Sequence, residues 1–363
     1  MPKPDILIAG AGIIGCSLAL RLAEEKVAVL VLDRGQPGEE ASWAAAGMLA
    51  PTSEHAQAPA ETELAAVSAA LYPSWIEKLE GRIKEPLGYR SEGTLLVAFS
   101  VDEAAQLAGL PGEALAPEEA QQREPALNKK LVAALFLPGD RQVDNRRLLQ
   151  ALRVAAVGAG VEFRAGAPAA EWWIESGRMR GVRTAAGEKL EAGAVVNALG
   201  CWAGTVPPLG RRYAPVRPVR GQMLALEAAP DFLRHVVRSP RGYLVPRGGG
   251  RLLVGSTMED AGYDKSVTPS GLRGLLAAAV EIAPGAAGLP FVEAWAGLRP
   301  DTPDHLPILG ATDIKNYFVA TGHFRNGILL APLTAELMTE AILNRKPRLA
   351  LAPFSPLRFA ETT

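Results

Sequence analysis

The sequence contains only two cysteines among its 363 residues, Cys16 and Cys201, in no Cys-x-x-Cys or Cys/His spacing. A disulfide framework and a zinc site of the usual spacing are therefore not supported. We expect both thiols to be buried in a protein of the reducing cytoplasm. The four histidines also lack metal-ligand spacing, and we predict no metal: they are His55, His235, His305 and His323.

Long hydrophobic runs and an excess of one charge are also lacking. Residues 6–22 are apolar, but glycines interrupt them and Arg21 lies among them, and no other segment approaches the roughly 20 apolar residues that a membrane span needs. The 38 basic residues nearly cancel the 39 acidic ones, with no block of like charge. A nucleic acid or a membrane is therefore not the expected partner, and a small molecule is.

A glycine-rich turn near the N-terminus predicts a dinucleotide site. The apolar run Asp5–Ala9 has strand length, and Gly10-Ala11-Gly12-Ile13-Ile14-Gly15 follows it and leads into a helical pattern. Gly10 permits the tight turn, Gly12 lets the backbone approach a pyrophosphate, and Gly15 lets helix and strand pack closely. The helix N-terminus then offers N–H groups and the positive end of its dipole to the phosphates.

An acidic residue completes this fingerprint. A second predicted strand, Ala28–Leu32, ends at Asp33, whose carboxylate can accept hydrogen bonds from an adenosine ribose. FAD and NAD enzymes share these features, so the fingerprint alone leaves the cofactor open. The following stretch, Gly38–Pro51, is rich in Ala and Gly, which favours main chain packed against a bulky planar ligand or, alternatively, ordinary helix packing.

Several motifs carry a family resemblance along nearly the whole chain. Besides the N-terminal fingerprint they are ASWAAAGMLAP (41–51), VVNALGCWAG (195–204), GYLVPR (242–247), VGSTMEDAGYDKSVTP (254–269), WAGLRPDTPDHLPILG (295–310) and ATGHFRNGILLAP (320–332). With these motifs the chain resembles the D-amino-acid oxidase superfamily of FAD-dependent oxidoreductases, and especially the glycine oxidases of thiamine biosynthesis.

The alternation of βαβ patterns with short β-rich runs predicts a mixed α/β fold with two interleaved domains. The resemblance implies a Rossmann-like FAD-binding domain and an antiparallel-sheet substrate domain made from separate pieces of chain. We assign residues 1–85, 141–211 and 297–363 to the first domain, and residues 86–140 and 212–296 to the second. We expect the Pro-rich segment 345–359 to lie on the surface.

Three side chains are candidates for binding the substrate carboxylate. Arg299 lies in an apolar context at the end of a predicted strand, where an arginine is costly unless it meets an anion. The family's matching arginine binds the substrate carboxylate, although a structural salt bridge to Asp301 or Asp304 is the alternative. The resemblance also implies Arg325, in the HFRNG loop, and Tyr243, whose hydroxyl would point at the carboxylate.

The resemblance implies non-covalent FAD, because no cysteine lies between Arg299 and Gly327, where the covalent-flavin sarcosine oxidases carry theirs. The periodicity predicts a helix over Gly327–Leu343, with Pro332 tolerable only near its first turn. The resemblance implies that the N-terminus of this helix points towards the pyrimidine edge of the flavin. The predicted cofactor-binding residues are Gly10, Gly12, Ile13, Ile14, Gly15, Asp33, Arg34, Ala41, Ser42, Ala46, Gly47, Met48, Ala169, His323, Phe324, Arg325, Asn326, Gly327, Ile328 and Leu329.

The expected activity is oxidative deamination of a small amino acid, with glycine first, by a homo-oligomer that uses dioxygen as its electron acceptor. D-amino-acid or sarcosine oxidation, or a dehydrogenase that reduces a quinone, would share the same carboxylate clamp. A flavoprotein without catalytic activity, or an NAD-dependent dehydrogenase, is the alternative from another class.

Overall fold

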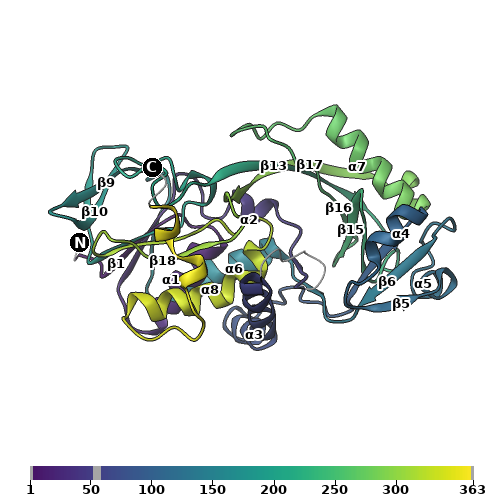
Figure 1. The fold of residues 1–363 in the computed structure, drawn as a ribbon, viewed down its shortest axis with the longest axis horizontal. Helices are drawn as coiled ribbons and strands as arrows, with labels where there is room; N and C mark the ends of the chain where they lie inside the picture. The colour runs from purple at the N-terminus through teal and green to yellow at the C-terminus, as the bar shows by residue number, and fades with distance from the viewer. Residues whose placement is uncertain (1–2, 52–58, 361–363) are drawn as a thin grey trace.

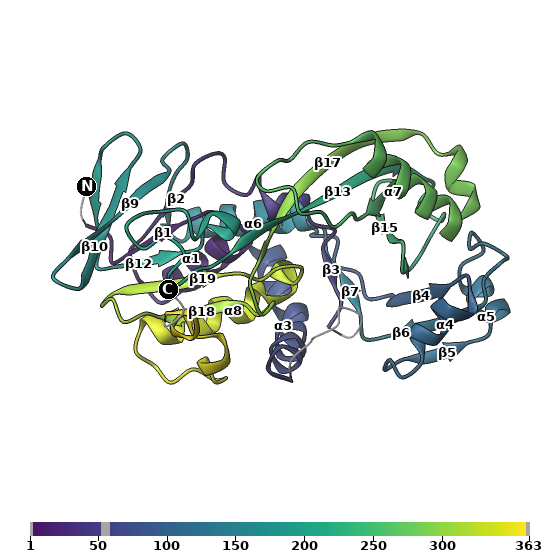
Figure 2. The same cartoon turned by 45° about the horizontal axis from the view of Figure 1, so that its top comes forward.

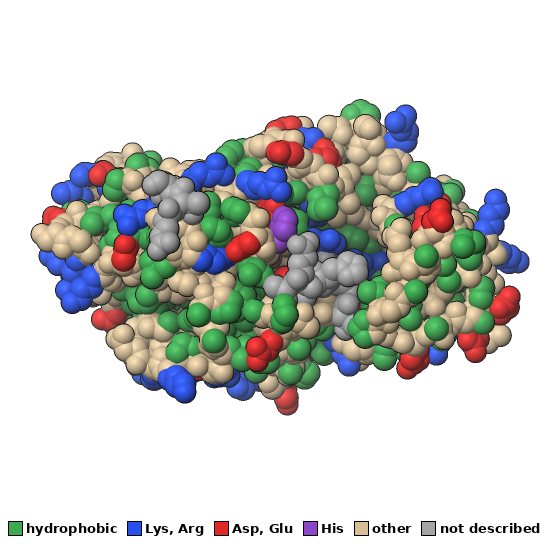
Figure 3. Space-filling view, in the orientation of Figure 1, with side chains coloured by type: hydrophobic (Ala, Val, Ile, Leu, Met, Phe, Trp, Pro, Cys, Tyr) green, Lys and Arg blue, Asp and Glu red, His purple; other side chains and the backbone are tan. Residues whose placement is uncertain are grey.

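The computed structural model describes residues 3–51 and 59–360, so His55 lies outside the described residues. The chain forms two lobes, and the long strands β13 (Arg217–Glu227) and β17 (Phe291–Asp301) run between them. Figure 3 shows basic and acidic side chains interspersed over the visible face, as the nearly balanced composition leads one to expect.

The first lobe is built on a six-stranded sheet in the order β18-β19-β12-β1-β2-β8. All neighbouring pairs are parallel except β18–β19. The central strand β1 is completely buried, which explains its continuous apolar sequence. The strands are β1 (Ile6–Ala9), β2 (Val29–Leu32), β8 (Glu162–Arg164), β12 (Ala194–Asn197), β18 (Ile308–Ala311) and β19 (Tyr317–Thr321).

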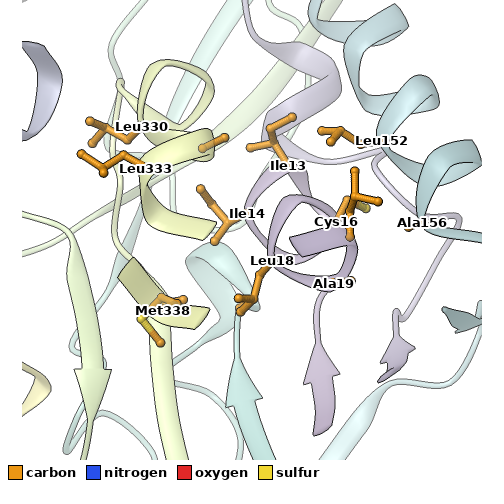
Figure 4. Close-up of a cluster of buried hydrophobic side chains, with 14 of the residues drawn as sticks. Ile13, Ile14, Cys16, Leu18, Ala19, Leu152, Ala156, Leu330, Leu333 and Met338 are labelled. Atoms are coloured by element: carbon orange, nitrogen blue, oxygen red, sulfur yellow. The ribbon is translucent and has the colours of Figure 1, made fainter. Parts of the chain in front are cut away.

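Helix α1 (Ile13–Glu24) lies at the centre of this lobe. It is buried on nearly all sides because α6 (Asn145–Gly158) and α8 (Gly327–Ile342) pack on either side of it. In Figure 4 the side chain of Ile14 points towards α8, and that of Cys16 lies on the side of α6. The helix that follows from the glycine-rich turn is therefore held in place by α6 and α8.

A small antiparallel sheet of β9 (Ala169–Glu175), β10 (Arg178–Thr184) and β11 (Lys189–Glu191) lies at the outer end of this lobe. Helix α2 (Ala41–Ala44), the two-stranded pair of β3 (Met48–Leu49) with β7 (Arg141–Gln142), and the long helix α3 (Pro59–Ile83) complete it. The C-terminal segment contains two short 3-10 turns, Ala352–Phe354 and Pro356–Phe359, of which Phe354 is buried.

The second lobe contains an eight-stranded sheet in the order β17-β13-β16-β15-β14-β4-β6-β5. Helix α7 (Pro269–Ile282) packs on β13 and β15, while α4 (Val101–Leu107) and α5 (Pro117–Arg123) accompany the last three strands. Its remaining strands are β4 (Thr94–Ala98), β5 (Glu113–Leu115), β6 (Ala133–Leu137), β14 (Val236–Ser239), β15 (Gly242–Arg247) and β16 (Arg251–Gly255).

This sheet is indeed made from two separate pieces of chain, but it is not purely antiparallel. Where the pieces meet, β14 pairs with β4 in parallel, with Val237 beside Leu95. Each piece forms its own antiparallel pairs, and the seam between them is free to be parallel because no hairpin joins its two strands. Strand β17 also continues through the predicted domain boundary at residues 296 and 297 without interruption.

Candidate active site

A large cavity lies where the two lobes meet. It encloses about 1120 Å³ of space not filled by protein atoms, its open mouth included. Sixteen of the residues predicted for the site line it: Gly12, Ile13, Ile14, Ala41, Ser42, Ala46, Gly47, Met48, Tyr243, Arg299, His323, Phe324, Arg325, Asn326, Gly327 and Ile328.

The glycine-rich turn has the geometry that its sequence predicts. Gly10 has a φ of 107°, and a Cβ there would lie 2.3 Å from the carbonyl oxygen of Ala198. A Cβ on Gly15 would lie 1.9 Å from the carbonyl oxygen of Gly10, so the helix can approach the turn only because residue 15 is glycine. Gly10 and Gly15 therefore determine the shape of the turn without lining the cavity, whereas Gly12 is part of the cavity lining.

Asp33 follows β2 and lies beside this turn. Its carboxylate accepts hydrogen bonds from the backbone N–H of Ala11 (2.8 Å) and of Gly35 (3.0 Å). It is not part of the cavity lining, but the bond to Ala11 holds it next to the residue that precedes Gly12. A ribose ligand for this carboxylate remains a prediction.

Arg34, Ala169 and Leu329 also lie outside the cavity lining. The Arg34 guanidinium stacks on the Trp202 ring at 3.5 Å and pairs with Glu40. Ala169 begins the outer strand β9, and Leu329 is buried in the first turn of α8. Their predicted cofactor contacts therefore have no support from the cavity geometry.

The Ala- and Gly-rich stretch 41–48 forms one wall of the cavity and packs against β17. A Cβ on Gly297 would lie 2.4 Å from the Cβ of Ala44, so the two chains meet closely because both residues are small. The Trp295 indole also donates to the carbonyl oxygen of Ala44 (3.0 Å). Small residues therefore serve the packing of this wall as well as its contact with a ligand.

A buried arginine from the second lobe holds the end of this wall. The Arg247 guanidinium donates to the carbonyl oxygens of Ala46 and of Val143, the latter at 2.6 Å. Burial lowers the pKa of Arg247 to about 10, so the group is still charged at neutral pH. A Cβ on Gly47 would lie 2.7 Å from this guanidinium, which leaves glycine as the residue that fits.

Two helices direct their N-termini into the cavity. Gly12 precedes α1 and Asn326 precedes α8; neither position has a side-chain cap, and neither first turn has an acidic residue. The Asn326 side chain instead donates to Glu61 on α3 (3.0 Å). The partial positive charges at both ends favour anionic groups of a ligand.

The side chains that line the cavity add to this positive character. Among its described lining residues there is no Asp or Glu, and Arg299 and Arg325 are the cations. His323 is buried and its Nε2 lies 3.1 Å from Thr334 Oγ1. Burial lowers the pKa of His323 to about 3, so this ring is neutral at physiological pH.

Arg299 extends from the end of β17 into the cavity. Its Nη2 donates to Ser256 Oγ (2.7 Å) and its Nη1 to the carbonyl oxygen of Thr257 (3.3 Å). A Cβ on Gly221 would lie 2.3 Å from the guanidinium, so the side chain crosses β13 over a glycine. The carboxylates considered as structural partners are engaged by other bases: Asp301 by Arg217 and His305, and Asp304 by Arg358.

Tyr243 lies across the neighbouring strand in the same way. Its ring covers Gly255, where a Cβ would come within 2.4 Å of it, and its hydroxyl reaches Met223 Sδ at 3.6 Å. A thioether is a weak acceptor, so the hydroxyl can turn to a stronger one. Because Gly255 directly precedes Ser256, the side chains of Tyr243 and Arg299 approach the same point of the cavity. Arg325, in contrast, is exposed at the cavity lining.

Several lining residues were missed by the sequence reasoning. Gly221 and Met223 come from β13, Ser256 follows β16, and Thr321 ends β19. Gly221 itself was a usable signal, because a glycine inside a strand, here β13, marks a close approach of other atoms. What approaches Gly221 is the side chain of a residue 78 positions later in the chain, which no local pattern indicates.

These observations fit a bound dinucleotide: a largely parallel sheet, a glycine-rich turn that leads into a helix N-terminus at the cavity, and a cavity whose described lining has no acidic residue. The fold and the cavity together define a dinucleotide-binding protein of the α/β class. More particularly, the chain belongs to the family of FAD-dependent oxidoreductases, whose model matches residues 5–341. FAD is accordingly its cofactor.

The chain is similar over its length to proteins of this family. It is 35% identical to the glycine oxidase of Pseudomonas putida, over 97% of this chain and 98% of that protein. It is 38% identical to the bifunctional protein ThiO/ThiG of Synechocystis sp., over 99% of this chain but only about half (54%) of that relative's length. The crystal structure of glycine oxidase from Geobacillus kaustophilus superposes with a TM-score of 0.92 at 34% identity, covering 98% of this chain and 99% of that one.

Among the described residues, no helix has the length and apolar character to cross a membrane. Residues 3–51 and 59–360 also contain no group of three or more His, Cys, Asp or Glu side chains arranged to hold a metal ion.

Proposed function

We propose that this protein uses FAD to oxidise glycine with dioxygen, and that water hydrolyses the resulting imino acid, so that the products are glyoxylate, ammonia and hydrogen peroxide. The observation that carries the proposal is Arg299, a guanidinium at the end of β17 in the same cavity as the two helix N-termini. The similarity to proteins named glycine oxidase supports glycine as the substrate. The similarity to a ThiO/ThiG protein supports a role in thiamine biosynthesis.

In this proposal Arg299 binds the substrate carboxylate, because a planar guanidinium matches a carboxylate with two parallel hydrogen bonds. Tyr243 donates its hydroxyl to the same carboxylate, and Arg325 adds positive charge at the cavity lining. When bound, FAD would supply the acceptor for the hydride, and with it the two electrons, that leaves the substrate Cα. These three side chains then need only hold the amino acid in the right position beside the cofactor, so no nucleophilic side chain is required.

The two helix N-termini have distinct tasks in this arrangement. The first turn of α1, beside Gly12, favours the pyrophosphate, and the first turn of α8, beside Gly327, favours negative charge on the ring system. Binding is non-covalent in this proposal, because both cysteines are buried and neither lines the cavity. FAD should therefore be released on denaturation by heat or acid.

The central test is Arg299→Ala in the FAD-loaded protein. Deleting one partner of a buried charge pair costs about 3 to 5 kcal/mol, so kcat/KM for glycine should fall by about 10² to 10⁴. Arg299→Lys should recover little, since a point charge cannot reproduce the two-bond fork. For an amine of similar size without a carboxylate, Arg299→Ala should leave kcat/KM almost unchanged. If kcat/KM for this amine falls as much as it does for glycine while the FAD content is unchanged, Arg299 is structural.

Assays of the parent protein with glycine, sarcosine and D-alanine decide the substrate. We expect glycine to give the highest kcat/KM, with stoichiometric hydrogen peroxide under air and no stimulation by a quinone. A preference for sarcosine or D-alanine, or a requirement for the quinone, would replace glycine oxidation by one of those related activities.

The proposal includes a homo-oligomer in the cytoplasm. Leu276 and Val280 lie four residues apart on α7 and are both exposed, and such an apolar strip supports self-association. Buried free thiols at Cys16 and Cys201 fit a reducing compartment. Light scattering of the purified protein measures the oligomeric state, and cell fractionation measures the location.

A further inference from the structure

We infer that Ser256 is a further ligand of the substrate carboxylate, acting together with Arg299 and Tyr243. The inference rests on the proposed function, because it assumes that the guanidinium of Arg299 receives a carboxylate. It adds a residue that the sequence motifs did not single out.

The position of Ser256 is determined by backbone pairing. Strand β16 ends at Gly255, and the segment after it is tied to β13. The backbone N–H of Gln222 donates to Thr257 Oγ1 (2.8 Å), and Arg220 and Glu259 exchange both backbone hydrogen bonds (2.9 and 3.0 Å). Ser256 therefore lies at the cavity lining just after the end of β16, on a segment that hydrogen bonds tie to β13, and it is half-buried there.

Ser256 is the acceptor in its one hydrogen bond, so its own O–H can still donate. The distance from Arg299 Nη2 to Ser256 Oγ is 2.7 Å, and a guanidinium can only donate, so the hydroxyl oxygen is the acceptor. Within the described chain this is the only hydrogen bond that Ser256 Oγ makes. Its O–H is then available for an acceptor in the cavity.

A carboxylate held by Arg299 supplies that acceptor. Its two oxygens accept about four hydrogen bonds, more than one guanidinium edge provides. Because Ser256 Oγ already lies at hydrogen-bond distance from Nη2, a carboxylate oxygen on the same guanidinium lies within reach of the serine proton. The hydroxyl then accepts from the cation and donates to the anion, and each bond polarises the other.

The small residues around the site keep this geometry open. Gly221 leaves the space through which the Arg299 side chain passes, and Gly255 leaves the space for the Tyr243 ring. With Arg299 and Tyr243, Ser256 completes a three-sided carboxylate pocket that consists of one cation and two hydroxyl donors.

The test is Ser256→Ala in the FAD-loaded protein, with acetate as the probe and calorimetry as the readout. A hydrogen bond to a charged group accounts for a 10- to 100-fold change in affinity, by order of magnitude, and we expect the Kd of acetate to rise by about that factor. Ser256→Thr, which keeps the hydroxyl, should bind acetate nearly as the parent does. The matched control is Ser74→Ala, which removes an exposed serine hydroxyl on α3 that bonds to the carbonyl oxygen of Leu71 outside the cavity, and it should leave the Kd nearly unchanged.

A crystal structure of the parent with FAD and acetate distinguishes contact from mere positioning. We expect Ser256 Oγ at about 2.5 to 3.0 Å from an acetate oxygen. An unchanged Kd in Ser256→Ala overturns the inference. So does a raised Kd if the acetate oxygen lies beyond hydrogen-bond distance of Ser256, or if Arg299 has moved in the variant, because the serine then only orients the guanidinium.

The outcomes also separate this inference from the proposed function. A parent that oxidises glycine, with Ser256→Ala binding acetate equally well, retains the function and loses only the inference. A parent that neither binds acetate nor oxidises glycine loses both.

Discussion

The Tyr72 hydroxyl donates a hydrogen bond to the carbonyl oxygen of Ile328, the acceptor that Pro332 leaves without its helical donor. Proline has no N–H and crowds the carbonyl four residues earlier, which makes it costly inside a helix. Pro332 is the sixth residue of α8, beyond the first turn to which the sequence reasoning limited it. Ser68 donates to the next carbonyl, that of Leu329 (2.7 Å), so α3 satisfies the opened turn from outside.

Tyr72→Phe should therefore destabilise the protein by about 1 to 3 kcal/mol, because it leaves a buried carbonyl without a donor. The cost should shrink in a Pro332→Ala background, where residue 332 has an N–H of its own. Urea unfolding of the two single variants and the double variant measures this coupling. Equal costs of Tyr72→Phe in both backgrounds would show that the tyrosine matters for packing alone.

Gly221→Ala should weaken substrate binding without unfolding the chain. The new methyl group would overlap the end of the flexible Arg299 side chain, 2.3 to 2.6 Å away, and not backbone atoms, so we expect the guanidinium to move. A displaced clamp should raise KM for glycine by about tenfold or more. Steady-state kinetics and the melting temperature are the measurements. Gly274→Ala, on α7 with open space around it, is the control and should leave KM unchanged.

Asp33→Ala should weaken FAD retention far more than it changes turnover in the fraction that keeps its flavin. Hydrogen bonds to a charged group contribute about 1.5 to 3 kcal/mol, so the Kd of FAD should rise roughly 10- to 100-fold. Asp33→Glu keeps the carboxylate and should retain most of the affinity. Titration of the apoprotein with FAD measures both. A hundredfold loss of turnover at unchanged FAD affinity would contradict a role in cofactor binding.

His323 should make the protein less stable as the pH falls. Its pKa in the folded state is about 3, below the value of about 6.5 in an unfolded chain, so the unfolded state binds the extra proton between these values. Stability is therefore lost as the pH falls through this window, by at most about 1.4 kcal/mol per pH unit.

His323→Gln removes that proton uptake and keeps a side chain able to bond Thr334. Between pH 7 and pH 5 the parent should lose about 2 kcal/mol more unfolding free energy than the variant. Urea unfolding in excess FAD at both pH values checks this. An identical pH dependence in both proteins would show that the ring takes up a proton in the folded state.

The sequence by itself determined the nucleotide-binding half of the site. The strand, the turn from Gly10 to Gly15, the helix and Asp33 follow one another within a short stretch of chain. The turn needs glycine at position 10 for its φ of 107°, and at position 15 because a Cβ there would meet the carbonyl oxygen of Gly10. The helix at Gly327 was also predicted, because its periodicity and its breaker residues are local. Arg299 was indicated by its apolar local context together with the family resemblance, and Tyr243 by the resemblance alone.

Only the tertiary structure decided how the other half is built. Gly221 makes room for Arg299, Gly255 for Tyr243, and Tyr72 compensates for Pro332, and in each pair the partners come from different elements of the chain. The parallel pairing of β14 with β4 is likewise a long-range contact, and so is the hydrogen bond from Arg247 to the carbonyl oxygen of Ala46. The physical reason is that a glycine or a buried arginine can be assigned a purpose only when its spatial neighbours are known, and the order of the strands, which no local pattern contains, determines those neighbours.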